Sequence, residues 1–283
     1  MEARASEAPV SGAVKVIRPA AGWSLPDVRE LWHHRDLVYY LSRRDIVVRY
    51  KQAVVGLFWA VLQPLLLACV FSLFLGQYAK VPSPPGVPYP LFVVSGLVIW
   101  LFFAGAVEKS ARSTVESEGL ISKIYFPRAI IPVSAVVPPV IDLLLAVVVL
   151  IVIGALYGFY PGLQILALPL CIGLALMTAL GLGLWLSALN VKYRDAGLVV
   201  PFALLVGLFI TPVMYPFDLV PENVQWLYSL NPMVGVLESF RWSMLGTDWP
   251  GALLLIPLAT GIVLLVTGAI YFERAQRSFA DVI

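Results

Sequence analysis

Long uncharged stretches alternate with short charged segments along most of this chain. Residues 52–79, 143–191, 196–217 and 249–272 contain no Asp, Glu, Lys or Arg. About 20 apolar residues in a helix cross a bilayer core of roughly 30 Å. The pattern therefore predicts an all-α polytopic membrane protein with six transmembrane helices. We place these helices at residues 54–76, 91–107, 133–157, 163–189, 197–215 and 251–272.

The third and fourth predicted spans form a helical hairpin. The uncharged run 143–191 is too long for one crossing, and YGFYPG at 157–162 supplies a turn with interfacial aromatic residues. The fourth span also carries small residues at four-residue spacing, which let another helix approach closely. This ladder is compatible with packing inside the chain or with a seam between two copies. It consists of Ala175, Ala179, Gly183 and Ser187.

The basic residues predict the orientation in the membrane. All but two of the 19 Lys and Arg residues lie in the segments between spans on one side, and the exceptions are Lys80 and Arg241. The positive-inside rule places that side, with both termini, in the cytoplasm. Because these residues flank spans and form no basic face, we expect no nucleic-acid partner.

Composition excludes a soluble domain and a self-contained enzyme. The mean hydropathy is +0.89 and 13% of residues are charged, against about a quarter in soluble proteins. Cys69 and Cys171 lie inside apolar spans without polar neighbours, so no metal site or disulfide is expected. The chain has no phosphate-binding Gly-x-x-x-x-Gly-Lys-Ser/Thr loop and no hydrolase motif. We expect no catalytic residue and no cofactor in this chain; if it drives transport uphill, the energy comes from elsewhere.

Three units follow from the pattern. Residues 1–23 have no apolar core and predict a disordered cytosolic tail. Residues 24–52 mix apolar and basic positions, which predicts an amphipathic helix in the cytoplasmic interface. Residues 53–283 form the six-span domain. Four basic side chains of the interface helix are expected to face lipid phosphates, namely Arg43, Arg44, Arg49 and Lys51.

The cytoplasmic loop 108–131 carries an unexpected apolar cluster. A charged helix continues out of the second span, Gly119 breaks it, and Pro127 ends the segment. Between them lie Leu120, Ile121, Tyr125 and Phe126. Such a cluster is expected to lie on lipid as an interfacial elbow, or in the groove of a cytosolic protein. The sequence leaves both possibilities open.

The outer segment 216–250 is too long for a hairpin and too polar to span. Pro221 and Asn231-Pro232 each mark the start of a short helix. Glu238 and Arg241 stand three residues apart and can pair. The pattern predicts re-entrant helices on the extracytoplasmic side that act as a gate.

One charge lies inside a predicted span. Asp142 is about 10 residues into the third span, which places it near the midplane at ~1.5 Å per residue. An intramembrane carboxylate is a candidate for a proton relay or a substrate contact. Because no acid, His or Lys accompanies it in another span, a hydrogen-bonded Asp that braces the helix is favoured.

Five segments resemble the type-2 ABC exporter permeases, specifically the branch that exports O-antigen, teichoic acid or capsule glycans. The resemblance runs from about residue 28 to the C-terminus, with the motifs in the expected order. They are LSRRDIVVRYKQAVVGLFWAVLQPL (41–65), GLISKIYFPRAIIP (119–132), NVKYRDAG (190–197), TPVMYP (211–216) and LNPMVGVLESFR (230–241).

The resemblance implies a homodimer in the bacterial inner membrane that encloses the export path of a lipid-linked polysaccharide. Two cytosolic subunits would bind ATP and Mg and drive transport. The loop would be the coupling helix that docks in the ATPase, through Glu118, Gly119, Leu120, Ile121, Tyr125, Pro127 and Arg128. The outer helices would be gate helices, with Pro216, Asn231, Pro232, Glu238 and Arg241 on the matching motif.

A sugar polymer needs faces along which its rings can slide, and aromatic side chains provide them. Trp59 and Phe103 are the first choices. The full set of candidates for the path is Phe58, Trp59, Trp100, Phe102, Phe103, Trp185 and Asp142. The alternatives are a secondary transporter, an ABC exporter permease for a lipid or small amphiphile, and a membrane scaffold.

Overall fold

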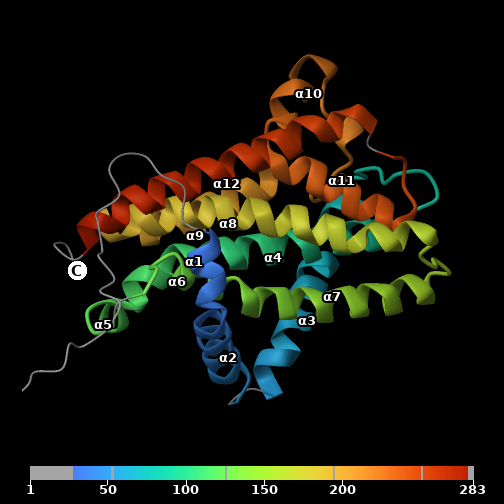
Figure 1. The fold of residues 1–283 in the computed structure, drawn as a ribbon. Coiled ribbons are helices and arrows are strands. Elements are labelled where there is room, and N and C mark those ends of the chain that lie inside the picture. Colours follow the sequence, from blue (N-terminus) through green and yellow to red (C-terminus); the bar gives the residue numbers. More distant parts are fainter. Residues whose placement is uncertain (1–27, 52–53, 125, 194, 250, 280–283) are drawn as a thin grey trace, which may run out of the picture.

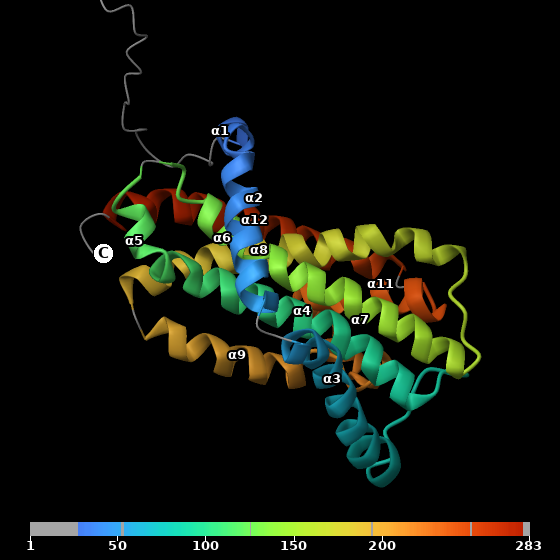
Figure 2. The ribbon, with the colours of Figure 1, turned by 90° about the horizontal axis from the view of Figure 1, so that it is seen from below.

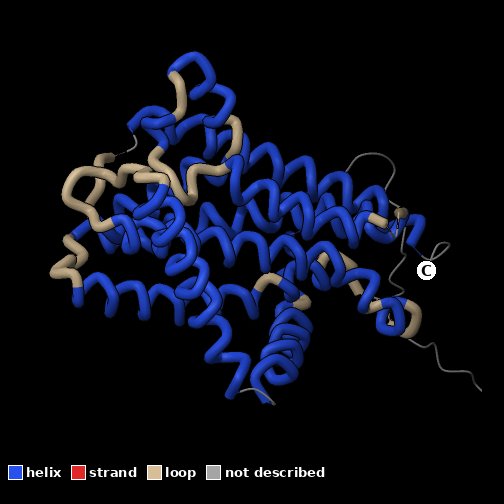
Figure 3. The backbone as a smooth tube through the Cα atoms, turned by 180° about the vertical axis from the view of Figure 1, so that it is seen from behind, coloured by secondary structure: helices blue, strands red, loops and turns tan. Residues whose placement is uncertain are grey.

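Helices account for the regular structure throughout. The computed structural model describes residues 28–51, 54–124, 126–193, 195–249 and 251–279. Within these ranges there is no strand, and most loops gather at the ends of the helices (Figure 3). The predicted all-α fold is confirmed.

The N-terminal helices run across one side of a bundle of longer helices (Figure 2). The predicted interface helix is divided into α1 (Val28–His33) and α2 (Arg35–Lys51). α2 buries Leu41 against the bundle and exposes most of its charged side chains, as an amphipathic pattern requires. The tail predicted at 1–23 lies outside the described residues.

Five described helices are long and apolar enough to cross a membrane. Several begin or end with a short irregular helical turn. The first begins as α3 (Val54–Phe71) and continues as η1 (Ser72–Tyr78). The others are α4 (Tyr89–Glu116), α6 (Ile130–Ala135) with α7 (Val137–Leu156), η2 (Leu163–Ala167) with α8 (Leu168–Lys192), and α12 (Leu255–Ala275), which follows η4 (Gly251–Leu254).

The remaining predicted span is shorter than expected. α9 (Ala196–Ile210) has 15 residues, which is about 22 Å at the rise of an α-helix. Thr211 takes an extended conformation because it precedes Pro212, and a residue before proline avoids the helical region. The helix therefore ends five residues before the predicted boundary at 215. The total of six crossings stays a prediction.

The outer segment folds as predicted from its prolines. It contains η3 (Phe217–Leu219), α10 (Glu222–Ser229) and α11 (Pro232–Leu245). Asn231 caps α11, since its side-chain oxygen accepts a hydrogen bond of 3.0 Å from the Met233 amide. Gly246, with φ of 67°, ends α11 in the left-handed conformation that glycine adopts readily. Both predicted helix starts are confirmed.

α4 is the centre of the bundle, and α8 packs along it. The small-residue ladder of α8 faces α4: a Cβ added to Gly183 would lie 2.6 Å from the Ser110 Cβ. One turn further along, the hydroxyls of Ser187 and Thr114 are 2.6 Å apart. The interpretation as packing within the chain is confirmed for these residues.

The segments that share a predicted side also share an end of the bundle. One end, called here the basic end, holds residues 28–51, 108–132, 190–193 and 273–279; there the Asn190 amide donates to the Ala111 carbonyl (3.1 Å). The opposite end, called the far end, holds residues 79–88 and 211–249. α5, α1 and the last turns of α12 gather at the first end, and α11 lies toward the second (Figure 1).

Candidate functional site

Two adjoining cavities that reach from the basic end into the bundle are lined by charged side chains. A cavity of about 500 Å³ lies between α2, α3, α4 and α7. A second of about 690 Å³ shares Arg49, Lys109 and Glu116 with it. Charged residues that line only the first are Glu108, Arg112 and Asp142.

Asp142 joins α7 to the interface helix. Its carboxylate pairs with the Arg49 guanidinium at 2.5 Å and accepts a hydrogen bond from the Tyr50 hydroxyl. Burial raises the pKa of Tyr50 above its usual value and the bond to Asp142 adds to this, so the hydroxyl stays protonated and donates. The structure therefore places Asp142 as a brace between helices. Arg49, predicted to face lipid phosphates, pairs with this carboxylate instead.

Replacing Asp142 by asparagine is expected to loosen α2 with little loss of global stability. Arg49 and Asp142 are partly exposed, and such pairs contribute roughly 0–1 kcal/mol. Hydrogen exchange of the α2 amides in Asp142→Asn should be faster than in the native chain. Asp45→Asn is the matched control, because Asp45 pairs with its neighbour Arg44 on the same helix. Equal exchange rates in both variants would contradict the bracing role.

The apolar cluster of the loop packs on the chain's own interface helix. α5 (Glu118–Ile121) follows α4 directly. Phe126 is buried with Leu41 of α2, and Leu120 and Ile121 pack against them. Phe126 is therefore covered by the chain itself, whereas Leu120 and Ile121 are only half-buried. That Leu120 and Ile121 lie on lipid or in a partner's groove stays a prediction. Tyr125 lies outside the described residues.

The exposed part of the loop differs from the predicted docking set. Glu118 and Gly119 are exposed, and Ile124 is the exposed apolar side chain, at 57%. Pro127 is half-buried, and the Arg128 guanidinium donates to the Gln276 carbonyl. Ile124 was missed because the sequence alone does not tell which apolar residues of the loop turn inward. An open pocket of about 250 Å³ lies beside it, lined by Ile121, Ser122, Lys123, Ile124, Phe126 and Arg128.

The aromatic candidates for the path fall into two groups. Trp59 of α3 and Phe102 of α4 line the 500 Å³ cavity together with Asp142. Phe58 and Trp59 are exposed along α3, at 61% and 52%. The structure therefore brings three of the seven predicted residues to one cavity.

The other three aromatic candidates pack between helices. Trp100 and Phe103 belong to the core, with ring centroids 5.4 Å apart. Trp185 stacks on Tyr271 at 4.1 Å and donates to the Thr267 hydroxyl, which joins α8 to α12. In the structure these side chains contribute to packing.

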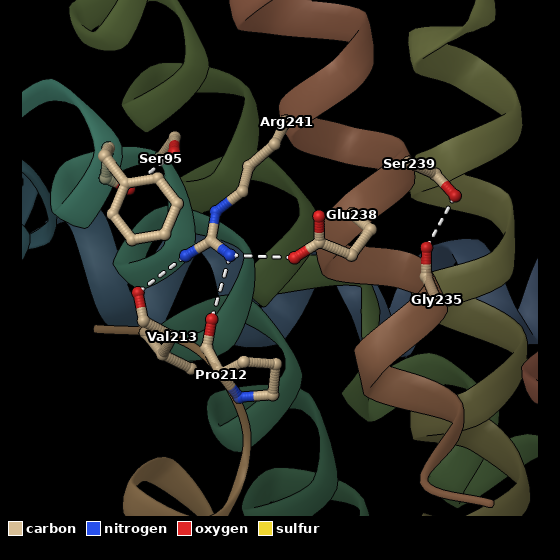
Figure 4. A network of polar contacts seen from close by, with 8 residues as sticks. Ser95, Pro212, Val213, Gly235, Glu238, Ser239 and Arg241 are labelled. Atoms are coloured by element: carbon tan, nitrogen blue, oxygen red, sulfur yellow. Dashed lines mark hydrogen bonds and ion pairs between the residues drawn. The ribbon is translucent and has the colours of Figure 1, made fainter. Parts of the chain in front are cut away.

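A buried arginine organises the far end (Figure 4). Arg241 is 1% exposed and donates to the carbonyls of Pro212 (2.8 Å) and Val213 (2.7 Å). It also pairs with Glu238 at 3.0 Å, which confirms the predicted pair, and its guanidinium carbon lies 3.8 Å from the Phe92 ring centroid. Burial lowers the pKa of Arg241, and Glu238 opposes that shift. No pattern in the sequence indicates the two carbonyl partners.

The remaining predicted gate residues fix the ends of the outer helices. The Asn231 amide donates to the Thr211 hydroxyl at 2.9 Å, and Pro232 is the first residue of α11. Pro216 precedes η3. Most of α11 is buried, whereas α10 exposes Trp226 and Leu227. α11 is therefore the fixed element of this segment and α10 the peripheral one.

The fold and its cavities define a class: a polytopic membrane protein with charged recesses at one end. Among the described residues no group of three or more His, Cys, Asp or Glu could hold a metal ion. Residues 36–245 match the ABC-2 type transporter family, and the chain belongs to that family.

Several curated relatives are similar over most of their length. The O-antigen export system permease protein RfbA of Klebsiella pneumoniae is 30% identical over 88% of this chain and 95% of its own. RfbA of Myxococcus xanthus is also 30% identical, over 90% of this chain and 98% of its own. The polysialic acid transport protein KpsM of Escherichia coli is 24% identical over 71% of this chain and 78% of its own. The family predicted from the motifs is confirmed.

Proposed function

We propose that this chain is the membrane permease of an ATP-driven exporter that moves a lipid-linked polysaccharide of the O-antigen class out of the cytoplasm. The similarity to O-antigen export permeases over about nine-tenths of the chain carries the proposal. The described structure supports it, because charged cavities and an exposed loop occupy one end and a gate-like segment the other.

The ATP-binding partner docks at the basic end. The sequence has no phosphate-binding loop, so two cytosolic subunits would hold ATP and Mg. The surface around Ile124 and Lys123 is exposed and adjoins an open pocket, which suits docking. Because Phe126 is buried in one cluster with Leu41 of α2, and α2 is tied to Asp142 of α7, displacement of the loop would shift both helices.

The short helix α9 makes the sixth crossing with the segment that follows it. Arg112 contacts the carbonyl of Gly197 (3.4 Å), and Tyr89 donates to that of Met214 (2.8 Å). Arg112 and Tyr89 are about 35 Å apart along α4. Because they contact the two ends of the segment 197–214, that segment covers the thickness of a bilayer. Six crossings place both termini on the basic side, hence in the cytoplasm beneath the bacterial inner membrane.

A second copy of the chain covers the flank formed by α3 and α9. The two helices lie on one flank in Figure 2, and Phe71 contacts Phe209 with ring centroids 6.5 Å apart. Leu198 and Phe202 of α9 are 78% and 67% exposed. Such a dimer would place Trp59, exposed on α3, beside the export path. The lipid-linked substrate would be loaded beside α2, where basic side chains line the two cavities.

The coupling surface is tested by Ile124→Asp. We expect at least about tenfold less ATPase co-purified with this variant, because a charge replaces an apolar contact at a docking surface. Val48→Asp is the matched control: Val48 is 72% exposed at the same end but lies on α2. Pull-down from native membranes, followed by ATP hydrolysis of the complex, provides the measurement.

Two outcomes would contradict the proposal. The first is that no ATPase accompanies the native chain, and the second is that Ile124→Asp and Val48→Asp retain it equally. A secondary transporter would instead move substrate in vesicles without ATP and depend on Asp142. That alternative has little support, because Asp142 is paired with Arg49. In addition, the other predicted spans contain no acid, His or Lys that could pass on a proton.

A further inference from the structure

A compact cavity at the far end takes no part in the coupling described above. It measures about 260 Å³ and lies beneath α11. A single water occupies about 30 Å³, so the cavity is too large for one water molecule. It lies just below the roughly 300–1,000 Å³ of pockets for drug-sized ligands. Its size therefore suits a small organic ring.

Two buried polar atoms in the wall of this cavity have no partner. They are the Arg241 Nε and the Thr247 Oγ1, which no hydrogen bond reaches within the described part of the chain. Both residues line the cavity. The accessible surface of each atom is below 1 Å², so neither atom is open to an occupant, and the exposed lining must supply the polar contacts.

The charge of the lining excludes an anionic occupant. Glu238 is neutralised by Arg241, which is the only Lys or Arg among the lining residues. Asp218 and Asp248 add two further carboxylates, both exposed. Phosphate or carboxylate groups would be repelled by them. Hydroxyl and ammonium groups would donate to them.

Aromatic rings complete the lining. Phe92, Phe217 and Trp249 border the cavity, and Trp249 is 58% exposed. The faces of such rings carry a partial negative charge and attract the polarised C–H groups of a flat, hydroxylated ring. Arg241 covers the Phe92 ring, so the rings of Phe217 and Trp249 remain. Their faces, beside carboxylates, make a combination that fits a monosaccharide.

We propose that this cavity binds one sugar unit, neutral or amino-substituted, of the glycan as it leaves at the far end. The proposal rests on the proposed function, since glycan export is what brings a polymer past this segment. It adds a substrate class: sugars that carry uronic acid or phosphate groups are disfavoured here.

Saturation-transfer NMR on the full chain in lipid nanodiscs tests the site. The probes are methyl α-mannopyranoside, methyl β-glucopyranoside and methyl β-glucuronide at millimolar concentration. We expect signals from at least one neutral glycoside, and about tenfold weaker binding of the glucuronide, because two carboxylates face it. Trp249→Ala should reduce the neutral signal at least fivefold. Trp226→Ala, which removes an equally exposed tryptophan of α10 outside the lining, should leave it unchanged.

Two further variants separate binding from folding. Thr247→Val removes a hydroxyl that is closed to the cavity and keeps the shape of the side chain, so both the fold and the glycoside affinity should persist. The double variant Asp218→Asn with Asp248→Asn should strengthen binding of the glucuronide. A gain of binding cannot result from misfolding.

The proposal is overturned if the native chain gives no glycoside signal, which would leave water as the occupant. It is also overturned if Trp249→Ala and Trp226→Ala behave alike, or if choline gives a signal and the glycosides do not. These failures are distinguishable from failure of the proposed function. If an ATPase co-purifies through Ile124 but no glycoside binds, the exporter stands and the sugar site falls.

Discussion

Arg241→Met is expected to destabilise the protein by about 3–5 kcal/mol, the cost of removing one partner from a buried ion pair. The change leaves the Pro212 and Val213 carbonyls without their donor and Glu238 without its cation. Thermal unfolding in one detergent should show a midpoint at least about 6 °C lower than that of the native chain.

The control for this variant is Arg44→Met. Arg44 pairs only with its neighbour Asp45 at the surface, and side chains of this kind contribute roughly 0–1 kcal/mol. If the two methionine variants unfold at the same temperature, the carbonyl contacts of Arg241 do not stabilise the far end.

Gly181→Val is expected to have the second large effect. α8 and α12 touch here through their backbones: a Cβ at Gly181 would lie 2.6 Å from the Leu265 amide nitrogen. No side chain can move aside, so the helices must separate, and overpacking of this kind costs about 1–3 kcal/mol or more. A lower unfolding midpoint and reduced yield of folded protein in membranes are the measurements.

Gly173→Val provides a matched control on the same helix. Nothing lies within 4 Å of a Cβ added to Gly173, and the residue is exposed. The free energy of unfolding of Gly173→Val should lie within about 1 kcal/mol of that of the native chain. The helix propensity of valine is only a few tenths of a kcal/mol below that of alanine and is higher than that of glycine. An equal loss of stability in Gly181→Val and Gly173→Val would mean that helix propensity, and not the contact between α8 and α12, causes the destabilisation.

Local signals predicted the features that depend on neighbours in the sequence. Asn231-Pro232 indicated the start of α11, since a cap and a first-turn proline act within one helical turn. Glu238 and Arg241 were predicted to pair because three residues bring side chains to one face of a helix. The end of α9 was misplaced because Val213 and Met214 are apolar and buried, yet lie in non-helical chain.

Contacts between distant segments could not be predicted in this way. Arg49 and Asp142 are 93 positions apart, and no spacing rule joins residues at that separation. The same holds for Phe126 and Leu41, which lie in one buried cluster. A single sequence gives the hydrophobicity of a residue but not which surface covers it, so Ile124 was overlooked.

The short helix α9 has a consequence for the surrounding lipid. A crossing of 15 helical residues on its own would require the bilayer to thin locally, at a cost for each ångström of mismatch. Non-helical backbone is tolerated at that depth only where its polar groups are satisfied by protein. Here Arg241 donates hydrogen bonds to the carbonyls of Pro212 and Val213, and the Tyr215 hydroxyl donates to the Ile210 carbonyl (2.9 Å). If α9 makes the proposed sixth crossing, the protein completes the hydrophobic thickness from its own chain, and the membrane beside α9 can keep its normal width.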